Sequence, residues 1–276
     1  MAHIRQVRIG ARGRRRAALG HRETAARCGN LPEAIERIRQ RACAGHVLEQ
    51  VQWGQVLRDS VYMPPRPDLA FRWFEGAALA GFGPGLNMLG RCYQFGWGCT
   101  QDLTRAAACF EQAALKGDAW GCYNLAILTM RGMGVARDLA RALSLFRAGA
   151  KAGHAKSMNL YARFLEEGWE VPQDRAQAEA WYRRSAEEGD YRGQHNYATL
   201  LCDRGDDQEA LMWWRKAVHE ATSDILLAMQ ARLESRVQAA GALCHEEESA
   251  LLDLVRQRLA GLELDVGLPL PHETVS

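Results

Sequence analysis

The stretch that decides the fold is RCYQFGWGCTQD, residues 91–102, in which a Gly-Trp-Gly turn separates two segments with the apolar spacing of amphipathic helices. The same place reads TMRGMGVARD 36 residues later and LEEGWEVPQD a further 36 residues on. A fixed period of roughly 20 to 50 residues is the signature of a repeat protein. The turn is therefore one part of a repeated unit.

Several columns of like residues keep the same 36-residue step. The glycine column is Gly81, Gly117, Gly153 and Gly189, and the aromatic column is Phe74, Phe110, Phe146 and Tyr182. Alanines flank each ring at a spacing of four residues, as in Ala106, Phe110 and Ala114, so all three share one helical face. Small residues on that face let a neighbouring helix approach closely. These eight columnar positions are predicted to be structural.

The ends of the predicted helices carry the residues that helix ends favour. The glycine column follows the last helical residue, where a left-handed cap strains glycine least. Asp102, Asp138 and Asp174 stand just before the second helix, where a carboxylate can accept from free backbone N–H groups and favour the helix dipole. Each unit is predicted as a helix A, a G-x-G turn, a helix B that ends at glycine, and a short link.

The pattern resembles the Sel-one-like repeat, a relative of the tetratricopeptide repeat with a longer loop. The motif that carries the resemblance is NMLGRCYQFGWGCTQDLTRAAACFEQAALKG, residues 87–117, and the next unit adds the family's valine as Val135. The resemblance implies an all-α fold: a right-handed α-solenoid of antiparallel helix pairs, with about five 36-residue repeats and a C-terminal helical cap. A tetratricopeptide array would step by about 34 residues, so it describes the chain less well.

The repeats divide the chain into four predicted segments. They are a basic, partly disordered N-terminal arm at 1–44, the solenoid at 45–221, capping helices at 222–262 and a flexible tail at 263–276. Full units cover 82–117, 118–153 and 154–189, and a shorter unit from 190 to about 221 lacks its G-x-G turn. An imperfect first unit precedes them, with its helix B at 68–80. Asp224 is expected to cap the first C-terminal helix, which covers the apolar face of the last repeat.

A stack of helix pairs forms a curved surface that binds peptides or proteins, and the resemblance places helix A on its groove. The predicted contacts on helix A are side chains that vary between repeats: Arg91, Arg163, Tyr123, Asn159 and His195. Asparagine there can bind the backbone of an extended peptide. The alternative is that these side chains are merely solvated.

The middle residues of the three turns, Trp97, Met133 and Trp169, would line up as an apolar stripe along the edge of the solenoid. If the stripe is exposed, it is a partner site, because aromatic residues and methionine are enriched at interfaces. If it is covered, each side chain only packs over a neighbouring loop. The sequence leaves both interpretations open.

The N-terminus supports a second class of function, nucleic-acid binding. Residues 1–22 carry seven arginines and no acidic residue, whereas the whole chain has a net charge of only +2. Such a segment attracts phosphate, but it lacks the aromatic residues and the fold that would read a base sequence. A solvated arm, or translation from a start upstream of Met63, explains the same residues. A mitochondrial leader is also Arg-rich, but serine is absent from the first 59 residues.

A third class, enzymatic or penicillin-binding, is known among cysteine-rich members of the family, which are secreted and carry regular disulfides. This chain has neither feature. HEEES at 245–249 is not a zinc motif, no P-loop or G-x-S-x-G occurs, and the eight cysteines form no C-x-x-C pair, which favours free thiols. No catalytic residue, metal or cofactor is predicted.

Composition completes the prediction. With 47% hydrophobic and 25% charged residues, no apolar run of about 18 residues and no secretory signal, the chain reads as a cytoplasmic protein. Arginine far outnumbers lysine, which suggests a GC-rich bacterial source. The sequence predicts a non-enzymatic adaptor that binds a protein or peptide partner in the groove or on the turn edge.

Overall fold

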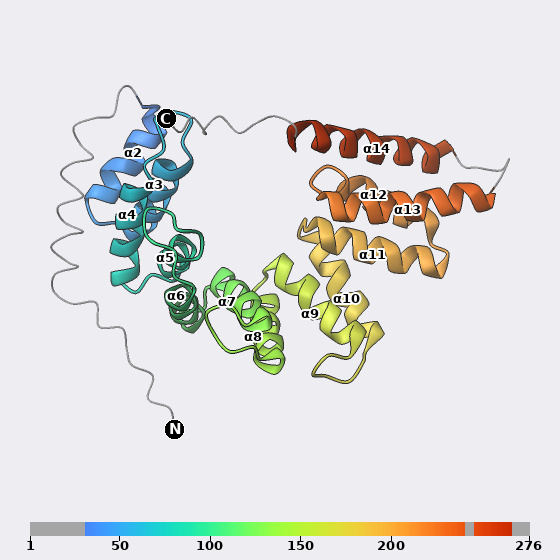
Figure 1. The fold of residues 1–276 in the computed structure, drawn as a ribbon, viewed down its shortest axis with the longest axis horizontal. Helices are drawn as coiled ribbons and strands as arrows, with labels where there is room; N and C mark the ends of the chain where they lie inside the picture. The colour runs from blue at the N-terminus through green and yellow to red at the C-terminus, as the bar shows by residue number, and fades with distance from the viewer. Residues whose placement is uncertain (1–30, 241–245, 267–276) are drawn as a thin grey trace, which may run out of the picture. The chain divides into compact units, whose positions relative to one another are not determined.

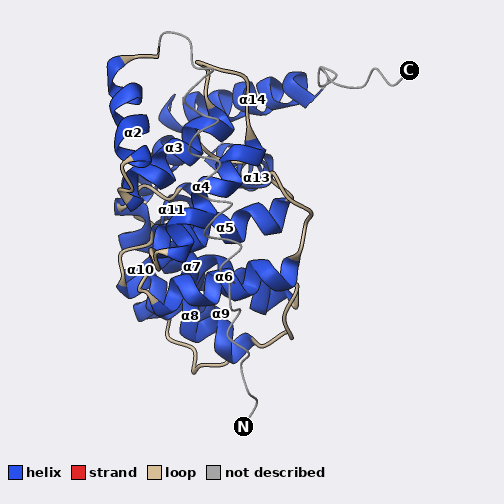
Figure 2. Ribbon diagram, turned by 90° about the vertical axis from the view of Figure 1, so that its left-hand side faces the viewer, coloured by secondary structure: helices blue, strands red, loops and turns tan. Residues whose placement is uncertain are grey.

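A computed structural model describes residues 31–240 and 246–266 of the chain. Within these ranges the chain forms 13 helices and no strand (Figures 1 and 2). The predicted all-α fold of antiparallel helix pairs is confirmed. The arginines of residues 1–22, Cys28, Cys244, His245 and most of the predicted tail at 263–276 lie outside the described residues.

The helices form two compact units, Met1–Ala152 and Gly153–Ser276. The described helices of the first unit are α2 (Glu33–Cys43), α3 (Val47–Asp59), α4 (Pro67–Leu79), α5 (Gly83–Phe95), α6 (Leu103–Leu115), α7 (Ala119–Arg131) and α8 (Leu139–Lys151). Helices α3 and α4, α5 and α6, and α7 and α8 are the A and B helices of three repeats. Each pair packs on the next through α4 with α5 and α6 with α7.

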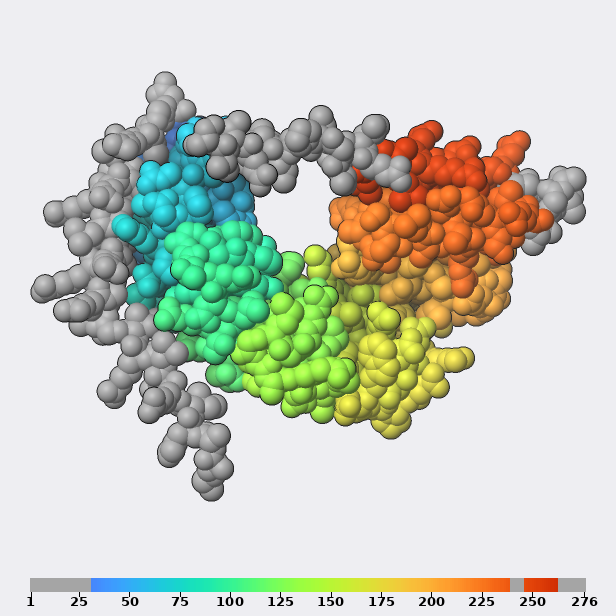
Figure 3. All heavy atoms as spheres, viewed as in Figure 1, coloured from blue at the N-terminus to red at the C-terminus, as the bar shows by residue number. Residues whose placement is uncertain are grey.

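The second unit continues the repeat and then departs from it. Its described helices are α9 (Ala155–Glu167), α10 (Arg175–Glu187), α11 (Tyr191–Arg204), α12 (Asp207–Ala217), α13 (Ser223–Ala240) and α14 (Glu246–Val266). Helices α9 and α10 form one repeat and α11 and α12 form the shortened one, with α10 packed on α11. In the space-filling view the orange and red helices of this unit form one continuous body (Figure 3).

The expected helix caps are present. The side chains of Asp102, Asp138 and Asp174 accept from the backbone N–H three residues on, at 2.9, 2.8 and 2.9 Å. Each carboxylate therefore satisfies one of the N–H groups that a helix start leaves free. The glycine column adopts the predicted left-handed conformation, with φ between 75° at Gly81 and 88° at Gly153.

The aromatic column fills the centre of each repeat, and Phe74, Phe110 and Phe146 are fully buried. The ring of Phe110 lies against Gly90 of helix A, where an added Cβ would come within 2.6 Å of the ring. Phe74 lies against Gly54 in the same way. The ring on helix B therefore packs against a small residue on helix A. A larger residue at that position of helix A would leave no room for the ring.

The shortened repeat keeps this arrangement by shifting its register. Because α11 and α12 are joined without the G-x-G turn, the ring that follows Tyr182 in the column comes 32 residues later, at Trp214. Trp214 is fully buried, and Ala210 and Val218 flank it as the alanines flank the other rings. The loss of four residues thus shortens the turn and leaves the core intact.

The last two helices pack on the end of the repeats. Helix α14 contacts α12 and α13, and α13 contacts α11. Arg236 of α13 binds Glu248 of α14 at 2.7 Å and Asp207 of α12 at 2.8 Å, so one guanidinium joins three helices. The expected capping role of Asp224 is wrong, because α13 begins at Ser223 and Asp224 lies inside its first turn.

The four predicted segment boundaries remain predictions. Within the segment 1–44, residues Glu33–Cys43 form helix α2, which packs on α3. Within 222–262, α13 and α14 contribute the buried apolar residues Leu226, Met229, Leu233, Leu251, Leu252 and Val255.

Two glycines of the first unit separate backbone strain from close packing. Both have positive φ, but a Cβ on Gly117 would meet nothing within 4 Å, whereas one on Gly134 would overlap the backbone of Leu103. We expect Gly117→Ala to lower the free energy of unfolding by about 1–2 kcal/mol, the strain of left-handed alanine. Gly134→Ala should have the same backbone strain and lower the free energy of unfolding by about 1–3 kcal/mol more, because its Cβ would overlap the backbone of Leu103. Urea unfolding of both variants measures the difference, and equal losses would contradict the close approach.

Candidate functional site

The three turn residues predicted to form a stripe differ in their surroundings. Trp97 is half-buried and packs against the core of the first repeats. Met133 is half-buried against the cluster that contains Phe110. Trp169 is the most open, with 38% of its surface exposed. Each side chain thus has one face on the protein and one toward solvent. The three residues are therefore neither fully exposed, as a partner stripe would be, nor fully covered by a neighbouring loop.

Trp97 lies among aromatic and cationic side chains. The ring of Phe95 stacks on it, with 4.9 Å between centroids and 27° between planes. The guanidinium carbons of Arg58 and Arg91 lie 4.2 and 5.0 Å from its centroid, within cation–π range. Arg58 comes from α3 of the preceding repeat, so the turn after α5 rests on its neighbour.

Trp169 has a simpler version of the same surroundings. The guanidinium carbon of Arg163 lies 5.3 Å from its ring centroid, and the ring of Phe164 meets it edge-on at 5.4 Å. Arg163 and Trp169 stand two repeats after Arg91 and Trp97, so the same arginine–tryptophan pair occurs in both units. The position two repeats after Arg58 is Met130 on α7, so α7 supplies no second cation from that position.

A third group of exposed aromatic side chains lies on α7. Trp120 is 46% exposed and meets the ring of Tyr123 edge-on at 6.1 Å. Tyr123, one of the predicted contacts, is half-buried, with its ring tilted against Phe146 at 6.3 Å. Trp120 thus adds an exposed ring to helix A, at the end of the helix opposite the turn.

Two predicted contact residues present little surface to a partner. Asn159 is 5% exposed, and its Oδ1 accepts from Nδ2 of Asn196 at 2.8 Å. In the first unit, Oδ1 of Asn87 accepts from Asn124 at the same distance. These amides join helices of successive repeats, so Asn159 is engaged within the fold.

His195, the other buried contact residue, is 9% exposed and lies beside the ring of Trp214, with 6.5 Å between centroids. Its Nδ1 has no hydrogen-bond partner among the described residues. Burial, and then repulsion from Arg232, lowers the pKa of His195 to about 4. The imidazole is therefore neutral at physiological pH.

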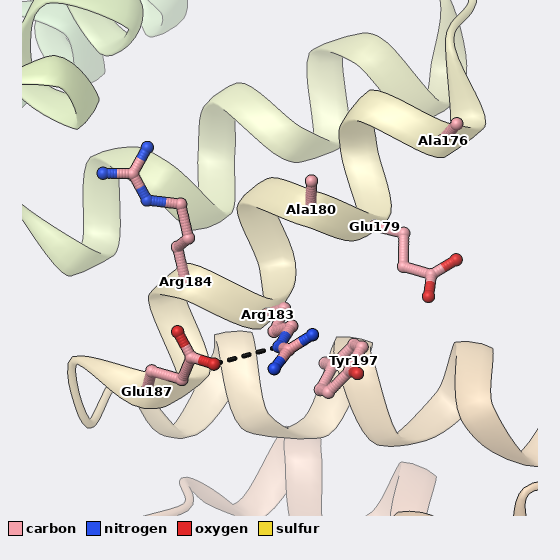
Figure 4. Close-up of a pocket in the computed structure, with 7 residues that line it drawn as sticks. All are labelled: Ala176, Glu179, Ala180, Arg183, Arg184, Glu187 and Tyr197. Atoms are coloured by element: carbon pink, nitrogen blue, oxygen red, sulfur yellow. Dashed lines mark hydrogen bonds and ion pairs between the residues drawn. The ribbon is translucent and has the colours of Figure 1, made fainter.

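A shallow hollow of ≈ 560 Å³ lies in the second unit, between α10 and α11. Figure 4 shows Arg183 lying between Glu187 and Tyr197, with its guanidinium bonded to Glu187 at 2.9 Å. Glu179, also on this hollow, binds Arg204 at 2.9 Å. Three of its charged side chains, Glu179, Arg183 and Glu187, are thus already paired, and the hollow is a weaker candidate site than the turns.

The cysteines of the described residues form no disulfide with one another. Six of them, Cys43, Cys92, Cys99, Cys109, Cys122 and Cys202, are free thiols. Burial raises the pKa of Cys92 and of Cys109 to about 12, so both remain protonated. No group of three His, Cys, Asp or Glu side chains in residues 31–240 and 246–266 is placed to hold a metal ion.

The comparison with protein families decides the class of the chain. The model of the Sel1 repeat matches residues 50–82, 83–118, 121–154, 155–190 and 193–220. The chain belongs to the Sel1 repeat family. The five matches coincide with the five helix pairs from α3–α4 to α11–α12, so the recognition of the family, including its imperfect first repeat, is confirmed.

Solved structures of Sel1 repeat proteins share the fold. A Sel1 repeat protein from Oxalobacter formigenes is 23% identical, with a TM-score of 0.69, and the match covers 87% of this chain and 99% of that one. A protective antigen of uropathogenic Escherichia coli with an SLR fold is 22% identical, with a TM-score of 0.63. That match covers 93% of this chain and 58% of the antigen. The comparison with curated proteins found no matching sequence.

Sel1 repeats generally mediate protein binding, and their solenoids are generally non-catalytic. In the described part of the chain, every helix is too short or too polar to cross a membrane.

Arg58 and Phe95 complete the surroundings of Trp97 and were not among the contacts predicted from the sequence. Arg58 belongs to the imperfect first Sel1 repeat, and its column continues as Gln94, Met130 and Glu166, so nothing in the repeat register distinguishes it. Phe95 is two residues before Trp97, and the F-G-W spacing is the one local signal that could have indicated a second exposed ring beside the turn.

Two buried histidines, His154 and His195, make stability depend on pH, and burial lowers the pKa of each to about 4. The pKa of His195 is about 4 in the folded protein and about 6.5 when unfolded, so below pH 6.5 only the unfolded state takes up the proton. Stability should therefore fall from pH 6.5 to 4. When the pH is lowered from 6.5 to 4, the free energy of unfolding of His195→Asn should fall by about 2–3 kcal/mol less than that of the native chain. Urea unfolding at both pH values measures this difference. The exposed His219→Asn is the control and should follow the native profile.

Proposed function

We propose that this Sel1 repeat chain is a non-enzymatic scaffold that binds a protein or peptide partner through its A helices and the turns that follow them. The observation that carries the proposal is the set of exposed aromatic side chains on these elements. Phe95, Trp120 and Trp169 are 52%, 46% and 38% exposed. They occur in both units, on successive A helices or turns.

Large exposed rings are a physical reason for binding. A tryptophan or phenylalanine ring left in water loses the free energy that burial would give, about 25 cal/mol for each Å² of apolar surface. Such rings anchor interfaces because they offer a large contact area and few rotatable bonds. The arginines stacked on Trp97 and Trp169 hold these two rings in fixed positions. A partner would therefore meet a preorganised surface.

The predicted contacts divide accordingly. Trp97, Met133, Trp169, Arg91, Arg163 and Tyr123 keep part of their surface open and form the proposed contact set. The bacterial source and the cytoplasmic compartment belong to the same proposal.

Nucleic-acid binding remains the second candidate. It depends on the seven arginines of residues 1–22, which lie outside the described residues. In the solenoid, arginines lie beside carboxylates, as in Arg141 with Glu111 and Arg204 with Glu179. Arginines paired in this way are less available to bind the phosphates of a nucleic acid.

Replacing the two turn tryptophans tests the scaffold. We expect the Trp97→Ala, Trp169→Ala double variant to lose its captured protein partner in affinity purification from the source cell, because the anchors are gone. Leu115→Ala is the matched control, since Leu115 is 81% exposed but lies on helix B, and it should capture as the native chain does. Circular dichroism at 222 nm should be the same for all three proteins. Retention of the partner by the double variant would disprove this assignment of the surface.

A further inference from the structure

The surroundings of Trp97 contain more positive charge than the fold uses. Arg58 and Arg91 both approach its ring, at 4.2 and 5.0 Å, from two different helices. Asp59 is the carboxylate that binds there, and it takes both Nε and Nη2 of Arg58. Among the described residues, the carboxylate bonded in this place therefore binds Arg58 and leaves Arg91 without one.

Arg91 is the group left over. Its nearest hydrogen-bonding contact among the described residues is the thioether of Met88, whose sulfur lies 4.0 Å from Nη1 and is a weak acceptor. Burial, and then repulsion from Arg58, lowers the pKa of Arg91. The guanidinium is thus held partly out of water, beside a like charge, and no anion from residues 31–240 and 246–266 is bonded to it. An incoming carboxylate would gain from both circumstances.

Arg58 adds charge to this place and little contact area. Its side chain is 16% exposed, and its Nη1 is buried without a hydrogen-bond partner among the described residues. Asp59 holds the guanidinium in position against the Trp97 ring. Arg58 therefore supplies a fixed positive field, and the half-exposed Arg91 supplies the donors that a ligand can reach.

Apolar surface surrounds the two arginines. Phe95, stacked on Trp97, is 52% exposed. Arg58 itself, with the end of α3 and the loop after it, lines an open hollow of ≈ 430 Å³, in which Val61 and Tyr62 are 90% and 55% exposed. A cation that no carboxylate of the described residues binds, bordered by exposed apolar side chains, is suited to a segment with an acidic residue next to apolar ones.

We propose that Arg91, Arg58 and Trp97 form a site for an acidic peptide, in which Arg91 binds the carboxylate of an Asp or Glu side chain and the Phe95–Trp97 pair takes a neighbouring apolar side chain. This site rests on the proposed function and names the chemistry of its partner. It is specific to the first unit. At Trp169 the equivalent Arg163 stands alone and exposed.

A random dodecapeptide library displayed on phage, selected on the full-length protein, tests the site. We expect the recovered peptides to be enriched in Asp or Glu next to aromatic or branched apolar residues. A recovered peptide, labelled and measured by fluorescence anisotropy, should bind Arg91→Gln about ten-fold or more weakly than the native chain, as expected for a charge-assisted contact. Arg91→Lys, which keeps the charge, should lose less.

A double-mutant cycle identifies the contact. Changing the peptide's Glu to Gln should weaken binding to the native chain to the same degree, but leave binding to Arg91→Gln nearly unchanged. Arg147→Gln is the control, because Arg147 is exposed on helix B (α8) of the same unit and lies outside the proposed contact set, and it should bind within about two-fold of the native chain. Circular dichroism checks that each variant is folded.

Other outcomes overturn the acidic site. If the recovered peptides carry no acidic residue, or bind Arg91→Gln as tightly as the native chain, the acidic site is wrong. If those peptides still depend on Trp97, the scaffold function survives without it. Binding of a 20-nucleotide single-stranded DNA that depends on Arg91, with no Arg91-dependent peptide recovered, would assign these arginines to nucleic acid instead.

Discussion

The structure depends on the close approach of successive helices at pairs of small residues. In the first unit Gly85 lies on Ala77 and Gly121 on Ala113, and a Cβ on either glycine would come within 2.6 Å of the alanine Cβ. In the second unit Gly193 lies on Ser185. Because an interior packed to this density yields little, these pairs fix the distance between one helix B and the next helix A. The spacing of the helices also sets the position of the turn that follows each helix A.

The parts of the fold that follow from local sterics could be predicted from the sequence. A left-handed cap requires glycine, a free helix start favours aspartate, and the ring of Phe110 requires Gly90, so each of these positions repeats and is visible. The burial of Asn159 and His195 could not be predicted in this way. Their environment is set by Asn196 and Trp214, which stand in other columns or in the shifted register of the shortened repeat. A contact between unlike columns leaves no periodic signal.

The candidate site follows the same division. The repeat register predicts that Trp97 and Trp169 are equivalent, and their arginine neighbours at Arg91 and Arg163 confirm the equivalence of backbone position. The difference between the two places comes from Arg58, which belongs to the preceding repeat. The scaffold is thus periodic, whereas the chemistry of its surface is decided by single residues that do not repeat. Fold alone therefore leaves the ligand undetermined.

The paired asparagines give the solenoid a second period. The acceptors Asn87 and Asn159 are 72 residues apart, as are the donors Asn124 and Asn196, and the arginine–tryptophan pairs share this doubled period. At these positions the structure therefore repeats every two units, whereas the buried rings repeat in every unit. Removing or inserting a single repeat would set an acceptor asparagine beside a residue that is not its donor. The hydrogen bonds between amides would be kept only if repeats were removed or inserted in pairs.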